Sequence, residues 1–442
     1  MEELIEAPVK RQDKINERIP WTNKPRVVII GGGFAGIELV RTLSKQDVQI
    51  VMIDKHNHHT FIPLLYQVAT AGLSPGDISS PLREFLKENK NFHFRLAKVK
   101  QIHADDKKVE TNLGFLKYDI LVIASGATTN FFGNDQLKAK AMKLREMSDA
   151  IELRTRLITN FEKALQLYED EKDELEKHMN IVIVGAGPTG VELAGAIGEL
   201  KKHVLPNDYP ELDFSKMKIH LVEGLDKVLA AMSDKAGKKA EKYLDHFEVD
   251  VHLGKFVEKY EDGIAHLSDG STLKTYCLIW AAGVKGNLIA GLREGAVEKG
   301  RIIVDQHNLV KGHEYVYAIG DVAMQKSEAY PKGLPQLAPV AIQQANHLGT
   351  NLKRLFAKKE MKPFKYVDKG TMATIGRNRA VVDGPFKMTI GGFIGWFVWM
   401  FVHLFSIIGI RRKLLVFANW VWNYFTYNRG NRLIINKDLD DV

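Results

Sequence analysis

Two short glycine-rich segments constrain the fold of this chain more than any other feature. GGGFAG occupies residues 31–36 and GAGPTG occupies residues 185–190; each follows four β-branched residues and precedes an apolar-periodic stretch. A strand that passes through a GxGxxG turn into a helix points free backbone N–H groups at an anion, which the helix dipole also favours. One such segment arises by chance, but two in the same context predict two bound dinucleotides.

The three glycines of each segment have separate roles. The first permits the tight turn out of the strand, the second lets a pyrophosphate approach the backbone, and the third lets the helix pack on the sheet. The alternative, two glycine-rich turns without a ligand, is disfavoured because both contexts match. The glycines are Gly31, Gly33 and Gly36 in the first segment and Gly185, Gly187 and Gly190 in the second.

An acidic residue follows the next strand after each segment. Asp54 follows the apolar run 48–53, and Glu223 follows the run 219–222. An acid at this place hydrogen-bonds a ribose hydroxyl, and it repels a 2′-phosphate, so Glu223 favours NADH over NADPH. The alternative for each acid is a solvated carboxylate at a strand end. A protein that holds two dinucleotides most simply passes electrons between them.

The composition is that of a globular protein with a basic surface. The chain has 442 residues, of which 45% are hydrophobic and 26% charged, and this length predicts two or three domains. The net charge of +8 is not combined with the aromatic pattern of a nucleic-acid groove, so nucleic-acid binding is not predicted; an anionic membrane leaflet fits better. Residues 1–24 mix acids and bases with little apolar period and predict a flexible or loosely packed extension.

The single cysteine, Cys277, limits the redox chemistry. One cysteine excludes intramolecular disulfides and any route for electrons through a cysteine pair. Cys277 lies in an apolar run and is expected to be inert core. No metal site is predicted.

The remaining pattern predicts an α/β protein with a duplicated nucleotide-binding unit. Each unit closes on an apolar strand and a small-residue turn, LVIASGA at 121–127 and LIWAAGV at 278–284. Ser148 is expected to cap a long helix that reaches Tyr168. The other expected elements are strands 26–31, 48–53, 180–184, 218–222, 249–253, 370–376 and 379–383, a strand within 315–321, and helices 33–45, 78–89 and 335–357.

The C-terminal region is rich in aromatic residues. Residues 388–410 contain no Asp, Glu, Lys or Arg, and Arg411, Arg412 and Lys413 follow them. The first run is long enough to span a bilayer, which takes ~20 apolar residues. Its glycines, its tryptophans and the basic cluster favour a helix that lies in the membrane interface, with the cluster facing anionic headgroups. A spanning helix, or a buried core or dimer contact, is the alternative.

Several of these segments together resemble the two-dinucleotide-binding-domain flavoproteins, and among them the type II NADH dehydrogenases. The general motifs are the two fingerprints, AAGV and AIGD. The specific ones are FIPLLYQVATAGL at 61–73, TMATIGRNRAV at 371–381 and the tail RRKLLVFANWVWNYFTYNRGNRLI. The resemblance implies two Rossmann-like, glutathione-reductase-like domains with C-terminal amphipathic anchoring helices. The expected domains are FAD-binding (25–145 and 301–386), NADH-binding (146–300) and membrane-anchoring (387–442).

The resemblance also assigns the two nucleotides. FAD is expected at the first fingerprint, with the Gly320–Asp321 turn at its ribitol or pyrophosphate side, and NADH at the second. An ordinary turn aspartate is the alternative for Asp321. The expected FAD residues are Gly31, Gly33, Phe34, Ala35, Gly36, Asp54, Lys55, Gln67, Ala124, Ser125, Gly126, Gly320, Asp321, Pro339 and Val340. The expected NADH residues are Gly185, Gly187, Pro188, Thr189, Gly190, Glu192, Glu223, Ala282 and Gly283.

Glu192 and Gln343 are the expected catalytic residues. The resemblance places Glu192 near the nicotinamide and flavin, as a polar anchor or proton relay; a first-turn glutamate that complements the helix dipole is the alternative. It places Ala338 and Gln343 at the quinone head, with an ordinary surface amide as the alternative for Gln343. Pro339 departs from the family, which has a glutamine there, and a proline donates no hydrogen bond.

The resemblance therefore implies a membrane-associated, non-proton-pumping NADH:quinone oxidoreductase that passes hydride from NADH to FAD and two electrons to ubiquinone or menaquinone. A homodimer bound peripherally to the cytoplasmic face of the cell membrane is expected. Two alternatives remain: a soluble FAD-dependent NADH oxidase or ferredoxin reductase of the same fold, and a membrane-associated NADH sensor.

Overall fold

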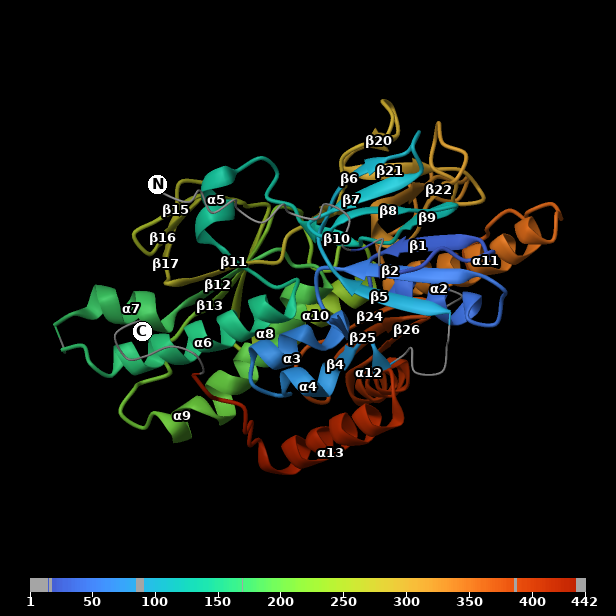
Figure 1. The fold of residues 1–442 in the computed structure, drawn as a ribbon. Coiled ribbons are helices and arrows are strands. Elements are labelled where there is room, and N and C mark those ends of the chain that lie inside the picture. Colours follow the sequence, from blue (N-terminus) through green and yellow to red (C-terminus); the bar gives the residue numbers. More distant parts are fainter. Residues whose placement is uncertain (1–14, 16–17, 85–90, 169, 385–387, 435–442) are drawn as a thin grey trace, which may run out of the picture. The chain divides into compact units, whose positions relative to one another are not determined.

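The computed structural model describes residues 15, 18–84, 91–168, 170–384 and 388–434. The chain forms two compact units, each made of segments that are distant in sequence (Figure 1). Unit 1 comprises residues 1–59, 80–128 and 285–367, and unit 2 comprises residues 60–79, 129–284 and 368–442. Each unit contains one of the two fingerprints, and the α/β fold class is confirmed.

A five-stranded parallel sheet forms the centre of unit 1. Its order is β22-β9-β1-β2-β5, and Val28 of β1 pairs with Val51 of β2 on one side and Leu121 of β9 on the other. Continuous apolar runs form such strands because both faces of a parallel sheet are covered. The bounds are β1 Arg26–Ile30, β2 Gln49–Asp54, β5 Phe92–Leu96, β9 Ile120–Ile123 and β22 Val316–Ala318.

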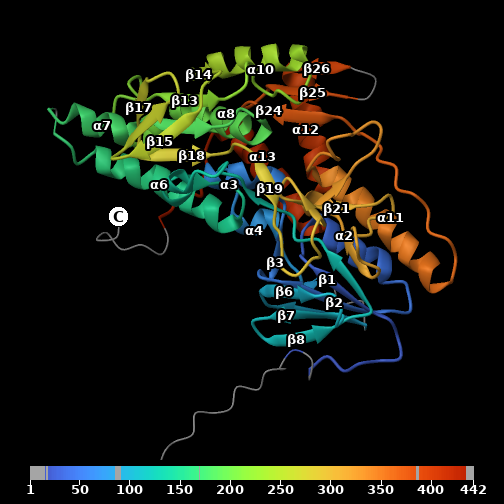
Figure 2. The same ribbon diagram turned by 90° about the horizontal axis from the view of Figure 1, so that it is seen from above.

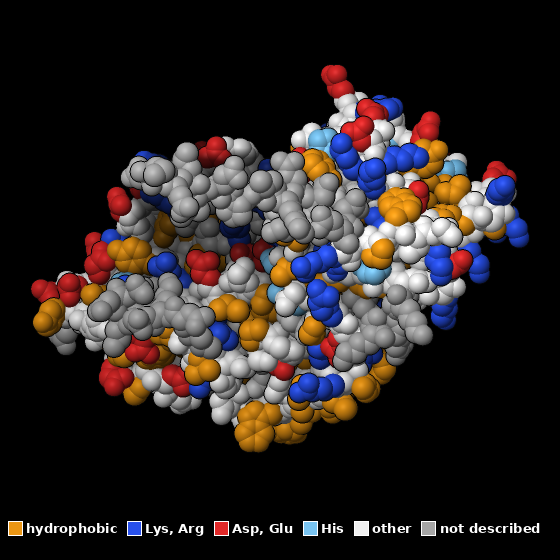
Figure 3. All heavy atoms as spheres, in the orientation of Figure 1, with side chains coloured by type: hydrophobic (Ala, Val, Ile, Leu, Met, Phe, Trp, Pro, Cys, Tyr) orange, Lys and Arg blue, Asp and Glu red, His pale blue; other side chains and the backbone are white. Residues whose placement is uncertain are grey.

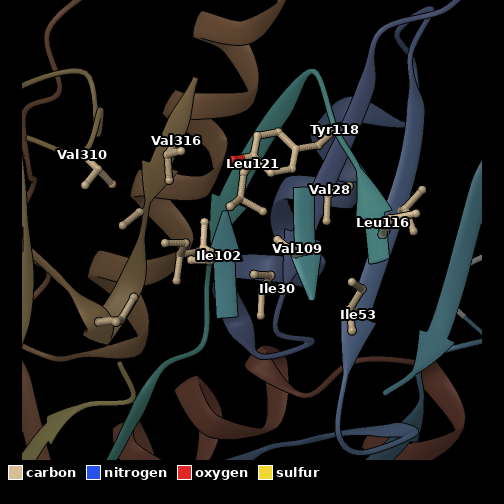
Figure 4. Packing of buried hydrophobic residues seen from close by; sticks show 14 of the residues in the cluster. Val28, Ile30, Ile53, Ile102, Val109, Leu116, Tyr118, Leu121, Val310 and Val316 are labelled. Atoms are coloured by element: carbon tan, nitrogen blue, oxygen red, sulfur yellow. The ribbon is translucent and has the colours of Figure 1, made fainter. Parts of the chain in front are cut away.

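Alternate side chains of this sheet enter two different layers. On one face, Val28, Ile30 and Leu121 pack against a three-stranded antiparallel sheet, β6–β8 (Figure 4). On the other face, Met52 lies under the first helix, α2 (Phe34–Leu43), which packs on α11 (Ala338–Phe356). The antiparallel strands are β6 Val99–His103, β7 Lys108–Thr111 and β8 Gly114–Lys117.

Part of the predicted N-terminal extension packs onto unit 1. Ile15 and Ile19 are buried in the same cluster as Val28. The Arg26 guanidinium donates to the carbonyl of Ile19, and the Gln49 amide donates to that of Pro20. Flexibility therefore does not extend to these residues; residues 1–14 and 16–17 lie outside the described part of the chain.

Unit 2 is also built on a five-stranded parallel sheet, ordered β11-β18-β12-β13-β14. Val182 and Val184 face a cluster with the small antiparallel sheet β15–β17, whereas Ile183 faces helix α8 (Pro188–His203). Figure 2 shows α8 and α10 (Asp234–His246) beside β13 and β14. The strands are β11 Met142–Lys143, β12 Ile181–Val184, β13 Ile219–Glu223, β14 Val249–Leu253, β15 Val257–Glu261, β16 Ile264–Leu267, β17 Thr272–Lys274 and β18 Cys277–Trp280.

Two expectations about helices are corrected. The long helix α6 spans Met147–Ala164, and its cap is Glu146, whose backbone N–H donates to the carboxylate of Asp149 at 2.8 Å. Ser148 is therefore inside the first turn, because a reciprocal capping box at Glu146 and Asp149 outcompetes a serine cap. Within the helix expected at 78–89, Ile78 ends α4 (Pro75–Ile78) and Ser79–Pro81 form β4, while residues 85–89 lie outside the described part of the chain.

The C-terminal part of unit 2 contains three strands and two helices. The helices are α12 (Gly392–Ser406) and α13 (Ile410–Thr426); α12 packs on β25, and α13 packs on α4. Within the described residues, no helix has both the length and the apolarity needed to cross a bilayer. The strands are β24 Thr371–Thr374, β25 Ala380–Asp383 and β26 Thr389–Gly391.

The surface of α12 and α13 is strongly apolar. Hydrophobic side chains gather along the lower edge of the molecule in Figure 3, where α13 lies in Figure 1. Arg411 is exposed in the first turn of α13, whereas Arg412 donates to the carbonyl of Ser79 and Lys413 to that of Phe405. The exposed large side chains are Phe393, Ile394, Phe397, Phe401, Val402, Phe405, Ile410, Leu414, Leu415, Phe417, Val421, Trp422 and Phe425.

The remaining elements connect these layers. They are β3 His58–Thr60, η1 Ile62–Leu64, α3 Leu65–Ala69, β10 Ala127–Thr129, α5 Asp135–Lys140, α7 Lys172–Met179, α9 Leu205–Asp208, β19 Val284–Gly286, β20 Val297–Glu298, β21 Arg301–Val304, η3 Gly320–Val322 and β23 Ala323–Gln325.

Candidate active site

The first fingerprint has the shape of an anion cradle. Gly31 has φ +111°, and a Cβ there would lie 2.2 Å from the carbonyl oxygen of Ala124. A Cβ on Gly36 would lie 1.9 Å from the carbonyl oxygen of Gly31, so only glycine allows this approach of helix and strand. A Cβ on Gly33 would meet no atom within 4 Å. The open space beside Gly33, at the start of α2, fits a pyrophosphate.

The second fingerprint repeats this geometry in unit 2. Gly185 has φ +102°, and a Cβ there would lie 2.7 Å from the nitrogen of Ala282. A Cβ on Gly190 would lie 1.9 Å from the carbonyl oxygen of Gly185, and one on Gly187 would meet nothing within 4 Å. The first-turn residues Pro188 and Thr189 are exposed, so the N-terminus of α8 is open to a ligand. Both cradles therefore suit a dinucleotide.

Each predicted acid is fixed to the loop of its own fingerprint. Asp54 accepts hydrogen bonds from the backbone N–H groups of Gly32 at 2.5 Å and His56 at 2.7 Å. Glu223 accepts from those of Ala186 at 2.6 Å and Leu225 at 2.9 Å. Both carboxylates are partly buried, so neither is the freely solvated strand-end acid of the alternative. A carboxylate has about four acceptor sites, which leaves capacity for a ribose.

The structure brings the Gly320 turn to the first fingerprint. A Cβ on Gly320 would lie 3.3 Å from that of Ala35 in α2 and 3.4 Å from that of Ala341 in α11. Asp321 therefore opens η3 next to the cradle, close to the first turn of α11, which contains Ala338, Pro339 and Val340. The hydroxyl of Ser125, the residue before Gly126, donates to the carbonyl of Asn287 at 2.7 Å.

Three glutamines in α11 and the segment before it hydrogen-bond the backbone. The Gln343 amide bonds the backbone of Val367 twice, donating at 2.9 Å and accepting at 3.0 Å. Gln344, which the sequence reasoning passed over, is buried and accepts from the N–H of Gly320 at 2.8 Å. Gln336 donates to the carbonyl of Asp321 at 2.9 Å. A quinone contact of Gln343 stays a prediction, and it requires the amide to exchange Val367 for the ligand.

Glu192 is a buried carboxyl in the second turn of α8. One of its oxygens accepts from the indole N–H of Trp399 at 3.2 Å and from the backbone N–H of Thr374 at 3.4 Å. Burial raises the pKa of Glu192 to about 8, against the lowering effect of those two donors. α8 has no acid in its first turn, so the alternative of a first-turn glutamate that complements the helix dipole is wrong.

A cavity of about 100 Å³ lies within unit 2, and its lining includes both hydrogen-bond partners of Glu192 but not Glu192 itself. Trp399 and Thr374, the two partners of Glu192, line it, and so does Gln67. The Gln67 side chain donates to the hydroxyl of Tyr66 at 3.0 Å and accepts from the indole of Trp420 at 2.8 Å. The other lining residues are Thr70, Gly72, Ala196, Glu199, Gly376, Arg377, Trp396, Met400, Asn423, Tyr424, Tyr427 and Arg429.

Charged groups are also part of the lining of the cavity. Glu199 and Arg429 form a buried ion pair at 2.8 Å. Arg377 donates to the carbonyls of Asn423 and Tyr424 at the end of α13 and stacks over Tyr427 at 3.6 Å. Sequence reasoning missed these residues, because partners about 230 positions apart share no local pattern.

Burial shifts the pKa values of His403 and Cys277 in opposite directions. The His403 ring stacks on Trp399 at 4.2 Å, and burial lowers its pKa to about 4, so it is neutral at physiological pH. Cys277 is fully buried, and burial raises the pKa of its thiol to about 12. The prediction of an inert core cysteine is confirmed.

Two Rossmann-like units, each with its own cradle and acid, define an oxidoreductase of the two-dinucleotide class. Residues 25–345 match the model of the pyridine nucleotide-disulphide oxidoreductases, and residues 369–427 match that of the NDH2 C-terminal domain. A type II NADH:quinone oxidoreductase of Mycobacterium tuberculosis, Ndh, is 34% identical over 93% of this chain and 90% of its own. One from Staphylococcus haemolyticus is 30% identical over 81% and 89%.

The chain belongs to the type II NADH:quinone oxidoreductase family. Its fold is also that of NDH2 from Plasmodium falciparum, solved in complex with NADH, with a TM-score of 0.84 at 20% identity over 93% of this chain and all of that one.

Proposed function

We propose that this chain oxidises NADH and reduces a membrane quinone at the membrane surface, without moving protons across the membrane. The observation that carries the proposal is the position of Glu192. Trp399 and Thr374, which donate hydrogen bonds to this buried acid, also line an aromatic cavity. The cavity lies in the unit that contains the second fingerprint and the C-terminal helices. A cavity whose lining contacts a proton donor, in the unit that also carries an apolar surface, suits a quinone.

The first cradle would hold FAD, whose flavin supplies the two-electron chemistry between NADH and quinone. Gly33 and the start of α2 would bind the pyrophosphate, and Asp54 the adenosine ribose. The Gly320–Asp321 turn and the first turn of α11 lie at the same cradle and would hold the ribitol side. The other FAD residues proposed are Gly31, Phe34, Ala35, Gly36, Lys55, Gln67, Ala124, Ser125, Gly126, Pro339 and Val340.

The second cradle would hold NADH. Gly187, Pro188 and Thr189 open the helix that meets the pyrophosphate, and Glu223 would bind the ribose and disfavour a 2′-phosphate. Ala282 and Gly283 form the turn after β18, next to Gly185. These contacts position the nicotinamide, and positioning is the main contribution of the protein to hydride transfer.

Glu192 would supply a proton to the quinone. Because burial raises its pKa to about 8, the carboxyl is largely protonated at neutral pH. Reduction of a quinone to a quinol takes up two protons, and a buried acid with a pKa near the working pH is suited to donate one. The aromatic lining of the cavity, including Tyr66 and Trp420, would surround the quinone head.

The apolar side chains of α12 and α13 would hold the enzyme on the bilayer. We propose a peripheral position on the cytoplasmic face, where NADH is available, and a homodimer. The exposed apolar face supports the membrane contact, because patches of this extent on a soluble surface mark interaction sites. If two copies bury this face against each other instead, the face will not bind vesicles, so a vesicle-binding measurement distinguishes the two arrangements.

The test uses detergent-purified protein with bound flavin. NADH oxidation is measured with ubiquinone and menaquinone analogues and, as a control, with ferricyanide, a water-soluble acceptor that needs no quinone cavity. Steady turnover that depends on a quinone is expected, and the ratio of the two analogues identifies the preferred one. NADH consumption that is independent of quinone would overturn the proposal and favour a soluble oxidase or reductase; flavin reduction without turnover would favour a sensor.

A further inference from the structure

Two side chains hold the peptide groups on either side of Gly32, the residue between the first two fingerprint glycines. Asp54 accepts from the N–H of Gly32 at 2.5 Å, and Nδ1 of His59 lies 3.2 Å from its carbonyl oxygen. A Cβ on Gly32 would lie 2.7 Å from a methyl carbon of Leu82, so the residue is also held sterically. Both backbone hydrogen-bonding groups of Gly32, its N–H and its carbonyl, therefore have a side-chain partner.

The chemistry of the carbonyl defines the state of His59. A carbonyl oxygen only accepts, so Nδ1 carries the proton and Nε2 presents a lone pair. The side chain is 3% exposed, and Nε2 has no hydrogen-bond partner among the described residues. An apolar residue would avoid the cost of this buried, unpartnered atom, so fold stability does not account for an imidazole here.

The His59 bond sets the direction of an N–H group in the cradle. In a trans peptide the carbonyl and the N–H point to opposite sides. A Gly32 carbonyl held by His59 therefore turns the N–H of Gly33 away from the imidazole. Gly33 is the N-cap of α2, has no side-chain cap of its own, and borders open space.

The second fingerprint has the same two constraints with one difference. Glu223 accepts from the N–H of Ala186 at 2.6 Å, as Asp54 does from Gly32. The carbonyl of Ala186, however, accepts from the backbone N–H of Leu229 at 2.8 Å. The main chain thus supplies the donor in unit 2, and a side chain supplies it in unit 1. In both cradles, therefore, this carbonyl has a hydrogen-bond donor.

We propose that His59 is a positioning residue for FAD: its bond to the Gly32 carbonyl holds the Gly33 N–H toward the pyrophosphate. The inference rests on the proposed function, in which the first cradle holds FAD. Packing is the competing explanation, since the His59 ring meets the ring of Phe34 edge-on at 5.0 Å. A substitution that keeps the bulk but removes the donor separates the two.

The test compares three variants. His59→Leu fills the space without a donor. His59→Asn places an amide nitrogen as many bonds from Cα as Nδ1 and so keeps the donor while losing the ring. His58→Leu is the matched control, because this neighbouring histidine bonds Asn57 and does not contact Gly32. The dissociation constant of FAD is measured on each apoprotein by quenching of flavin fluorescence, and that of NAD⁺ by calorimetry.

His59→Leu should weaken FAD binding about tenfold, the effect of losing one hydrogen bond, and leave NAD⁺ binding unchanged. His59→Asn should stay within about threefold of the wild type, and His58→Leu should match it. Equal FAD affinity of His59→Leu and wild type, or equal losses in His59→Leu and His59→Asn, would overturn the inference. Wild-type apoprotein that binds no FAD would instead overturn the proposed function. If His59→Leu does not fold, His59→Asn decides alone: retained affinity supports the donor role, and a tenfold loss contradicts it.

Discussion

The indole N–H of Trp399 donates to the carboxyl of Glu192 across 3.2 Å, and this bond ties α12 to the helix of the second fingerprint. The surface-facing helix thereby contributes a partner to a buried acid whose pKa is raised to about 8 by burial. Trp399 itself is buried, whereas half of the other residues of α12 are exposed. A change at α12 is therefore expected to reach the chemistry of the site.

Glu192→Gln should lower quinone reduction at least tenfold at pH 7, since a general acid–base group typically contributes about 10²–10⁴-fold, and it should leave NADH:ferricyanide activity nearly unchanged. With a pKa of about 8, the wild-type carboxyl donates a proton below pH 8, so quinone turnover should fall as pH rises through that value. The decline should vanish in the variant. Parallel pH profiles of the two proteins would show that another group sets the step.

The same pKa predicts a change in stability. The folded-state pKa of Glu192 is raised above its ordinary value of 4.5, so between about pH 4.5 and 8 the folded protein binds more protons than the unfolded chain. Stability from this group is complete at low pH and is lost as pH rises through the window. Glu192→Gln removes the ionisation, so its melting temperature should exceed that of the wild type at pH 8 and match it near pH 5. Thermal unfolding at both values checks this, and an equal difference at both would contradict it.

Trp399→Phe separates the hydrogen bond from the packing. The Trp399 donor favours the ionised form of Glu192 and so lowers its pKa. Removal should move the midpoint of the quinone pH profile upward by up to about one unit, the equivalent of one hydrogen bond. The control is Trp396→Phe, which changes a tryptophan of the same helix that has no bond to Glu192. An unmoved midpoint in Trp399→Phe would show that the bond does not act on the proton donor.

The sequence was sufficient to predict the two cradles because their determinants are local. Gly31, Gly36 and Asp54 lie within 24 positions of one another, and their spacing alone fixes strand, turn and helix. The cavity that Trp399 and Thr374 line could not be predicted from local spacing. Gln67, Glu199, Trp420 and Arg429 come from α3, α8, α13 and the chain beyond it, and only packing brings them together. Gln343 shows the limit of a motif match. The motif places its amide at a ligand, but it does not reveal that the amide hydrogen-bonds the backbone of Val367.

The buried pair of Glu199 and Arg429 should fasten the chain after α13 to α8. Removing one member leaves a buried charge unpaired, so Arg429→Met should lower the free energy of unfolding by about 3 kcal/mol. The double variant Glu199→Gln, Arg429→Met should recover much of the loss, because neither charge then remains. Urea unfolding of both single variants and the double variant measures the coupling. A double variant as unstable as the sum of the singles would show that the pair does not interact.

The exposed aromatic face of α12 should bind vesicles. Phe397→Asp replaces a side chain that is 52% exposed with a charge, so folding should be unaffected while membrane binding is lost. Phe256→Asp is the matched control, because Phe256 is 55% exposed in unit 2 but lies outside both helices. Sedimentation with vesicles should separate the two variants, and both should keep NADH:ferricyanide activity. Arg411→Glu, the exposed member of its basic cluster, should weaken binding to anionic vesicles about fivefold or more, since each basic residue near such a surface contributes about 1 kcal/mol. It should not alter binding to neutral vesicles. Retained vesicle binding by Phe397→Asp, with a change of oligomeric state instead, would assign this face to a contact between two copies of the chain.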